Sequence, residues 1–269
     1  MSNSFQSVAE TGIASFPESR SNAPKVCRGL AGDWPAVRTW GFRQLAGRVP
    51  DLPVQLVVGN REGAVTRLVP GSLRRWLLSC CDPAAQTSYL KDFDLLRAVP
   101  SLRADVDGER LLPRGSLGAV RSWIGPAGAQ TGLHYDHLDN VAVQIVGWKR
   151  WRLVRPGTVE QLGGMSAKYD AWAVLSSASA GELAERGGAS DHFFEVDVGP
   201  GDALHIPAGW WHEAVNLTPS ILLGGFHGPR VAVLARWAWV GARDAAHRAG
   251  WFARGHCTCH SAVQVDVLR

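Results

Sequence analysis

The sequence predicts a mainly β domain flanked by helices. From about residue 117, short segments rich in β-branched and aromatic residues follow one another, as in "VAVQIVG" and "FFEVDVGPGDALHIP", and Gly and Pro separate them. Several such segments at close spacing are typical of a β-barrel or sandwich. The chain before them, and the alanine-rich stretch after Gly228, contain apolar residues at helical spacing. We therefore expect a helix-rich start, a β-rich second half and a helical end.

The first half of the chain predicts helices and strands in alternation. We expect a helix over residues 35–48, which starts at Pro35, because proline is favoured at the first helical position. A strand follows over residues 54–60, then a helix within 71–81, then an extended segment that leads into a short helix within 88–99. Residues 1–23 are polar, and we expect a flexible tail there.

The second half predicts the strands that form the barrel. We expect strands within residues 117–125, 141–147, 149–155, 193–207, 210–217 and 220–226, with a long insertion over 156–190. Residues 24–228 would then form one domain, and residues 229–269 a C-terminal helical extension and tail. The Trp-rich helix after residue 230 would either cover the bottom of the barrel or form a homodimer face, and the sequence leaves both readings open.

Composition bounds the class of protein. The chain has 269 residues, of which 46% are hydrophobic, enough for one large globular domain. No apolar run reaches the roughly 18 residues of a membrane span, and the N-terminus lacks the pattern of a secretion signal. The cysteine count is odd, and the adjacent Cys80 and Cys81 are poorly placed to bridge each other, which suits a reducing compartment. We therefore expect a cytoplasmic protein without membrane contact. A net charge of +4, spread along the chain, hints at an anionic partner at best.

The stretch "TGLHYDHLDN", residues 131–140, carries the first candidate site. On a β-strand, side chains two positions apart share a face, so His134 and Asp136 point the same way. His212 would open a later strand, and in a small barrel that strand could face the first pair across the interior. Two histidines and one carboxylate on one side of a metal leave open positions. This is the facial-triad arrangement of non-haem Fe(II) oxygenases.

A lysine after this stretch predicts a second part of the site. If residues 140–146 and 149–155 were antiparallel neighbours joined by "GW", Lys149 would return toward the metal end. A lysine inside a barrel is costly unless a carboxylate meets it, and the distal carboxylate of 2-oxoglutarate would be such a partner. Thr131 and Asn140 flank the His134 and Asp136 pair and could donate hydrogen bonds to the same ligand.

Four segments, in this order, resemble the JmjC and cupin-like-8 group of Fe(II)/2-oxoglutarate oxygenases. They are "CRGLAGDWPAVRTW", "YLKDFDLL", "WIGPAGAQTGLHYDHLDNVAVQIVGWKRWRLVRP" and "EVDVGPGDALHIPAGWWHEAVNL". The likeness covers roughly residues 24–228. It implies a double-stranded β-helix, also called a jelly-roll or cupin/JmjC barrel, with N-terminal α/β elements and C-terminal helices.

The resemblance also implies roles for single residues. The iron ligands of the group match His134, Asp136 and His212, and the lysine that pairs with the co-substrate matches Lys149. Residues that line or bind the co-substrate pocket match Thr131, Asn140 and Tyr89.

The chain departs from the group on a late strand. Relatives often carry an Asn and a Trp there, whereas this sequence has Gly224, Gly225 and His227. Either the pocket is more open at this point, or His227 supplies a replacement contact.

The activity implied by the resemblance is hydroxylation of a C–H bond with Fe(II), 2-oxoglutarate and O₂, giving succinate and CO₂. A peptide or protein side chain is the first choice of substrate, followed by a small molecule of specialised metabolism. N-demethylation would use the same iron, and a nucleic acid base is neither required nor excluded by the mild positive charge. The alternative of another class is a non-catalytic cupin-like binding module. The intact triad and Lys149 argue against such a module.

Overall fold

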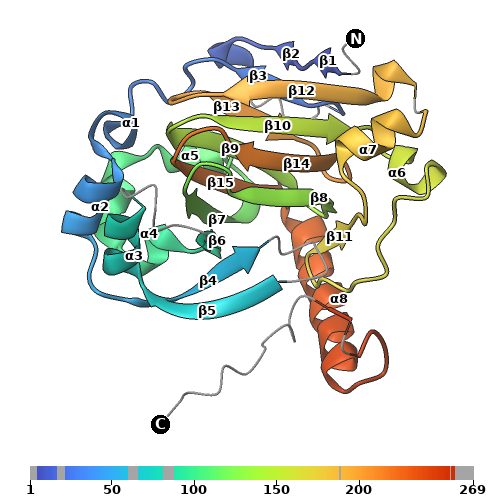
Figure 1. Ribbon diagram of the computed structural model, residues 1–269. Helices are drawn as coiled ribbons and strands as arrows, with labels where there is room; N and C mark the ends of the chain where they lie inside the picture. The colour runs from blue at the N-terminus through green and yellow to red at the C-terminus, as the bar shows by residue number, and fades with distance from the viewer. Residues whose placement is uncertain are drawn as a thin grey trace.

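Two β-sheets packed face to face form the centre of the molecule (Figure 1). The computed structural model describes residues 5–16, 22–59, 66–80, 88–187, 189–254 and 256–257. The chain is mainly β, with a jelly-roll core as expected. Figure 1 shows helices α1 to α4 gathered at one side of the sheets and α8 extending from the opposite side.

The smaller sheet consists mainly of strands from the second half of the chain. Neighbouring strands in this sheet are antiparallel, except for β1, which runs parallel to β12. Its strands, in spatial order, are β1 (Gln6–Ser7), β12 (Phe193–Val198), β10 (Lys149–Val154), β14 (Trp211–Asn216), β8 (Gln130–Asp136) and β11 (Ala173–Leu175).

The larger sheet combines strands from both halves of the chain. Only β2 and β3 pair in parallel within it. Its strands, in spatial order, are β2 (Ala9–Glu10), β3 (Lys25–Cys27), β13 (Ala203–Ile206), β9 (Asp139–Val146), β15 (Ser220–Pro229), β7 (Ser116–Gly125), β6 (Ser88–Phe93), β4 (Pro53–Gly59) and β5 (Thr66–Ser72).

Helices surround the two sheets (Figure 1). No helix within the described ranges is long and apolar enough to cross a membrane. The helices are α1 (Pro35–Thr39), α2 (Phe42–Arg48), α3 (Leu73–Ser79), α4 (Leu95–Ala98), α5 (Gly108–Leu111), α6 (Thr158–Gln161), α7 (Ala180–Glu185) and α8 (Arg230–Arg248), with 3₁₀ turns η1 (Ile13–Ser15), η2 (Pro100–Asp105) and η3 (Ser190–His192).

The alternation of side chains on β9 divides the core into two layers. Val141 and Val143 point outward and pack in the cluster that also holds buried residues of α2 and α3. Ala142 points inward and packs between the sheets in the cluster that contains Trp151 and Leu204. Because both faces of β9 are covered, the strand is apolar almost throughout.

The predicted helix over residues 35–48 is wrong as one element. Helix α1 ends at Thr39 and α2 starts at Phe42, while Trp40 and Gly41 between them are extended. The Trp40 side chain is buried, and its indole N–H donates a hydrogen bond of 2.7 Å to Asp105. Tertiary packing of this tryptophan, next to a poor helix former at Gly41, therefore overrides the local helical pattern.

Residues 1–23, for which a flexible tail is expected, pair with both sheets where the structure describes them. Residues 6–7 add to the edge of the smaller sheet and residues 9–10 to the edge of the larger one. The amide of Thr11 donates a further hydrogen bond of 2.9 Å to the carbonyl of Val26. The remaining tail residues 1–4 and 17–21 lie outside the described residues.

The expected pairing of residues 140–146 with 149–155 is wrong, because β9 and β10 belong to different sheets. Gly147 links them with a φ of +75°, in the left-handed region that favours glycine. A Cβ at this position would lie 2.1 Å from the carbonyl oxygen of Pro219. The tight link therefore carries the chain across the core and delivers Lys149 from the opposite sheet.

Two histidines lie buried on the outer face of the larger sheet, opposite the core between the sheets. The side chains of His205 on β13 and His227 on β15 are 4% and 5% exposed. Burial lowers the pKa of His205 to about 4 and also lowers the pKa of His227, against the weaker opposing influence of Asp139. The neutral form of each ring is therefore favoured in the fold.

We expect the free energy of unfolding to fall as the pH drops from about 6.5 toward 4. The unfolded chain binds protons on these histidines in that window before the folded chain does, so acid favours unfolding. His205 alone would account for at most about 3 kcal/mol of that loss. Urea unfolding of the parent and His205→Leu across this window measures the effect, with the half-exposed His192→Gln as control. If His205→Leu left the pH dependence of the free energy of unfolding unchanged, the lowered pKa of His205 would not be its cause.

Candidate active site

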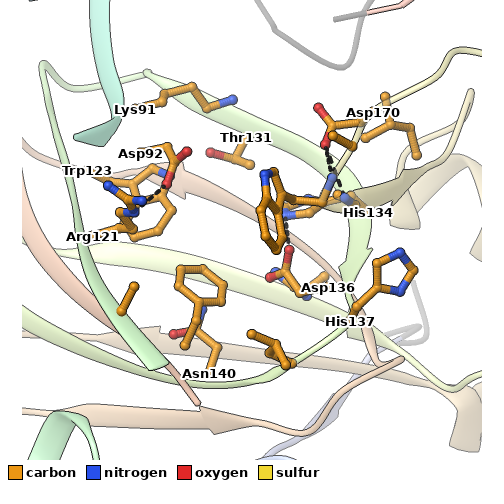
Figure 2. Close-up of a pocket in the computed structure, with 18 of the residues that line it drawn as sticks. Lys91, Asp92, Arg121, Trp123, Thr131, His134, Asp136, His137, Asn140 and Asp170 are labelled. Atoms are coloured by element: carbon orange, nitrogen blue, oxygen red, sulfur yellow. Dashed lines mark hydrogen bonds and ion pairs between the residues drawn. The ribbon is translucent and has the colours of Figure 1, made fainter. Parts of the chain in front are cut away.

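A cavity of about 560 Å³ opens between the two sheets (Figure 2). Strands of both sheets line it, together with the insertion that carries β11 and one face of α8. All three predicted metal ligands lie on its wall, as do Lys149, Thr131 and Asn140. The cavity therefore gathers residues from segments far apart in the sequence.

Paired strands bring the predicted triad together. His134 on β8 lies directly opposite His212 on β14, and the ring centroids are 4.3 Å apart. Asp136 follows on the same face of β8, with one carboxylate oxygen 3.4 Å from Nε2 of His212 and the other 4.0 Å from Nε2 of His134. One ligand atom from each residue lies within 4.8 Å of the others. Their role as iron ligands stays a prediction.

Backbone carbonyls fix the orientation of both imidazoles. Nδ1 of His134 lies 2.7 Å from the carbonyl oxygen of Gly132, and Nδ1 of His212 lies 3.0 Å from that of Trp210. A carbonyl only accepts, so each Nδ1 must carry the proton and each Nε2 keeps its lone pair. Both lone pairs are thus available beside Asp136, which is the arrangement that metal-binding histidines require.

The charge of Asp136 is held by its two histidine neighbours. Burial alone would raise the pKa of this carboxyl, but the nearby imidazoles of His212 and His134 lower it below its ordinary value. A carboxylate with two neutral imidazoles is a donor set that suits Fe(II) and related ions. The residues present therefore fit the metal that the sequence implies.

His137 lies outside this donor set, although it also lines the cavity. Strand β8 ends at Asp136, so strand alternation does not decide the direction of His137. Its ring packs edge-on against Tyr135 and Trp239, with centroids 5.8 and 5.7 Å away.

Lys149 reaches the same cavity from β10. It is 2% exposed, and its ammonium donates a hydrogen bond of 3.1 Å to the hydroxyl of Tyr89. Within the described residues no carboxylate forms an ion pair with it. Burial, reinforced by the charge of Lys91, lowers the pKa of Lys149 to about 7. A buried cation of this kind suits an anionic ligand.

The three remaining predicted residues surround Lys149 and the triad. Tyr89 on β6 accepts the hydrogen bond from Lys149, and Thr131 on β8 lines the cavity. Asn140 on β9 lines it as well, and its carboxamide oxygen is buried without a hydrogen-bond partner among the described residues. These positions fit a polar co-substrate, but their roles stay predictions.

The glycines on β15 do not open the pocket. A Cβ on Gly224 would lie 2.8 Å from the ring of Trp123 and 3.2 Å from the carboxamide oxygen of Asn140, so both side chains fill that space. Gly225 points outward, where a Cβ would lie 2.0 Å from the carbonyl oxygen of Leu111. His227 is buried and is not among the residues that line the cavity. It therefore supplies no replacement contact at the cavity wall.

Sequence reasoning missed the part of the wall that lies outside the barrel. Asp170 and Trp172 come from the insertion, and Trp237 and Asp244 come from α8. The sequence carries no local signal for these four, because only the docking of both segments brings them to the cavity. Lys91 was also missed, although it lies two residues after Tyr89 on the same strand, and strand alternation could have found it.

Comparison with known proteins gives a family match over most of the chain. The model of a family described as "Cupin-like domain" matches residues 19–233. Jumonji C domain-containing protein 5 of Drosophila melanogaster is 30% identical over 138 residues, 49% of this chain and 34% of that protein. Lysine-specific demethylase 8 of Xenopus tropicalis is 24% identical over 212 residues, 74% of this chain and 47% of that protein.

A third relative has a name of a different kind. HSPB1-associated protein 1 of Rattus norvegicus is 31% identical over 225 residues, 73% of this chain and 46% of that protein. The chain thus spans between about a third and a half of the length of these three relatives.

We expect Lys149→Met to stabilise the chain in the absence of ligand. Methionine fills a similar volume without a buried charge, so the free energy of unfolding should rise by about 1–3 kcal/mol at neutral pH. The lowered pKa sets the sign: the gain is complete below about pH 7 and fades as the pH rises toward 10.5, where the unfolded lysine also becomes neutral. Thermal and urea unfolding measure it, with Lys25→Met as control. A destabilised Lys149→Met would contradict the account.

Proposed function

This chain belongs to the cupin-like (JmjC) family, and from that premise we propose that it is an Fe(II)- and 2-oxoglutarate-dependent oxygenase that hydroxylates a C–H bond. The observation that carries the proposal is the meeting of His134, Asp136 and His212 in the cavity that also buries Lys149. When bound, the iron would supply the oxidising chemistry, with O₂ as oxidant and succinate and CO₂ formed from 2-oxoglutarate.

The triad residues would hold the metal on one flank. His134 and His212 would present Nε2, since the backbone carbonyls of Gly132 and Trp210 retain each Nδ1 proton. Asp136 would offset part of the metal's charge. Because all three ligands come from two paired strands, the opposite flank of the metal faces the cavity, where both co-substrates must bind.

Lys149 would hold the far carboxylate of 2-oxoglutarate. Its ammonium is already directed by the hydroxyl of Tyr89, so little side-chain freedom is lost on binding. An anion beside it would raise the pKa of Lys149 and keep the lysine charged. Apolar side chains on the wall, including Trp123, Leu222 and Phe226, would exclude water from the reacting groups.

A basic side chain of a peptide or protein is the substrate that we favour. Asp244 and Trp237 of α8, together with Asp170 and Trp172 of the insertion, line the cavity, and Trp172 and Trp237 are 48% and 38% exposed. Carboxylates beside indole rings favour a cation. Three of the relatives carry the name lysine-specific demethylase, so N-demethylation is the second candidate reaction. A cationic small molecule would meet the same wall.

The proposed setting is a reducing compartment such as the cytoplasm. Cys27 is a buried free thiol, which supports this setting. Pairing of two copies through α8 also remains a proposal.

We expect His134→Ala and Asp136→Ala to abolish succinate formation from 2-oxoglutarate in the presence of Fe(II) and O₂. Each change removes one of three metal ligands, so the affinity for Mn(II), a probe for the ferrous ion, should fall by about 100-fold or more. Calorimetry measures the affinity, and His137→Gln tests the neighbouring histidine, which should keep metal binding. Parent-like succinate formation by either alanine variant would refute the triad assignment.

We expect Asp244→Asn to weaken recognition of cationic substrates. Loss of one carboxylate at the wall should raise KM for lysine-rich peptides about tenfold, with a smaller effect on neutral peptides. Succinate release stimulated by each peptide gives the measurement, and Asp191→Asn on the exposed turn η3 serves as control. A similar KM change for neutral and cationic peptides would argue against a charge-based role.

A further inference from the structure

Strand β6 contains a bulge next to the active-site cavity. Leu90 pairs with Ile124 and Phe93 with Ser122, so β6 advances three residues while β7 advances two. Asp92 lies within this bulge with a φ of +55°, a left-handed conformation that is unfavourable for a residue other than glycine. Bulges and strained residues of this kind often direct a side chain at a functional site.

The bulge changes which side chains reach the cavity. Leu90 and Phe93 both pack in the outer core cluster, although a regular strand would place them on opposite faces. Tyr89 and Lys91 face the other way, where Tyr89 meets Lys149 and Lys91 lines the cavity. Lys91 shares the cavity face of Tyr89 by strand alternation, and the extra residue returns Phe93, which would otherwise follow on that face, to the core. Figure 2 shows the Lys91 side chain extending over the cavity.

Lys91 and Lys149 converge on one aromatic ring. Each ammonium nitrogen lies 5.7 Å from the centroid of the Tyr89 ring. The neighbouring carboxylates of Asp92 and Asp94 each lie 3.5 Å from the guanidinium of Arg121. Two ammonium groups at one end of a cavity repel each other, and a bound anion would relieve that repulsion.

We propose that Lys91 is a second cation of the anion-binding end of the cavity, and that it acts with Lys149 on the outer carboxylate of a dicarboxylate co-substrate. The proposal rests on the proposed function in taking 2-oxoglutarate as that dicarboxylate. Lys149 binds from the buried side, and Lys91 binds from the half-exposed side. The strained Asp92 directly follows Lys91, at the point where β6 turns its next side chain, Phe93, back to the core.

Affinities for two ligands test the proposal. The experiment uses four proteins loaded with Mn(II) in the absence of O₂: the parent, Lys91→Met, Lys91→Arg and Lys25→Met. Each protein is titrated with 2-oxoglutarate and, separately, with 2-oxopentanoate, which lacks the outer carboxylate. We expect Lys91→Met to bind 2-oxoglutarate about tenfold more weakly and 2-oxopentanoate unchanged. Lys91→Arg should recover most of the loss, and Lys25→Met on β3 should match the parent. An unchanged affinity for 2-oxoglutarate, or equal weakening for both ligands, overturns the proposal.

A second measurement separates this proposal from the oxygenase activity. The lysines of the chain are Lys25, Lys91, Lys149 and Lys168, so ¹³Cε-lysine NMR reports on each one. Glutarate, a dicarboxylate without the metal-chelating keto group, is added to the Zn(II)-loaded chain. Joint shifts of the Lys91 and Lys149 signals support the proposal, and a static Lys91 signal overturns it. If both signals shift but the Fe(II)-loaded chain forms no succinate, the proposed oxygenase function is contradicted and the role of Lys91 in anion binding is still supported.

Discussion

The antiparallel pairing of β8 with β14 is the constraint on which the site depends. It places His134 and His212 directly opposite each other, although several helices and strands lie between β8 and β14 in the sequence. Asp136 follows on the same face because strand side chains alternate. Each imidazole is further tied to a carbonyl of its own strand, at Gly132 and Trp210. Hydrogen bonds of the sheet therefore hold the donor atoms in place, and metal binding would require little reorganisation of these side chains.

Two features that weaken the fold lie at the same end of this cavity. Lys149 is a buried cation whose ammonium donates a hydrogen bond to a neutral tyrosine hydroxyl, and Asp92 adopts a left-handed backbone conformation. Neither helps an empty protein to fold, since burial disfavours the charged lysine and sterics disfavour the backbone of Asp92. Local rules of stability are usually broken where function needs it. Their closeness to the triad is therefore an argument for ligand binding that is independent of any motif.

The sequence predicted the parts of the site that local periodicity controls. The spacing of His134 and Asp136 was enough to place them on one face of a strand. The short segments rich in β-branched and aromatic residues indicated the sheets. It failed where distant contacts decide the structure. Trp40 breaks the first expected helix because it packs toward Asp105, far along the chain. The Gly147 link sends β10 into the other sheet, on a path where the carbonyl of Pro219 approaches too closely for any side chain larger than that of glycine. No local pattern encodes either outcome.

Part of the cavity wall lies beyond the family match. The triad and Lys149 lie on strands inside residues 19–233, whereas α8 runs from Arg230 to Arg248, so Trp237 and Asp244 lie beyond the matched residues. Similarity to relatives therefore bears on the metal and co-substrate end more strongly than on the α8 part of the wall that a substrate would meet. Since side chains on that wall decide which C–H bond comes close to the metal, shared chemistry is compatible with a substrate that the names of relatives do not reveal.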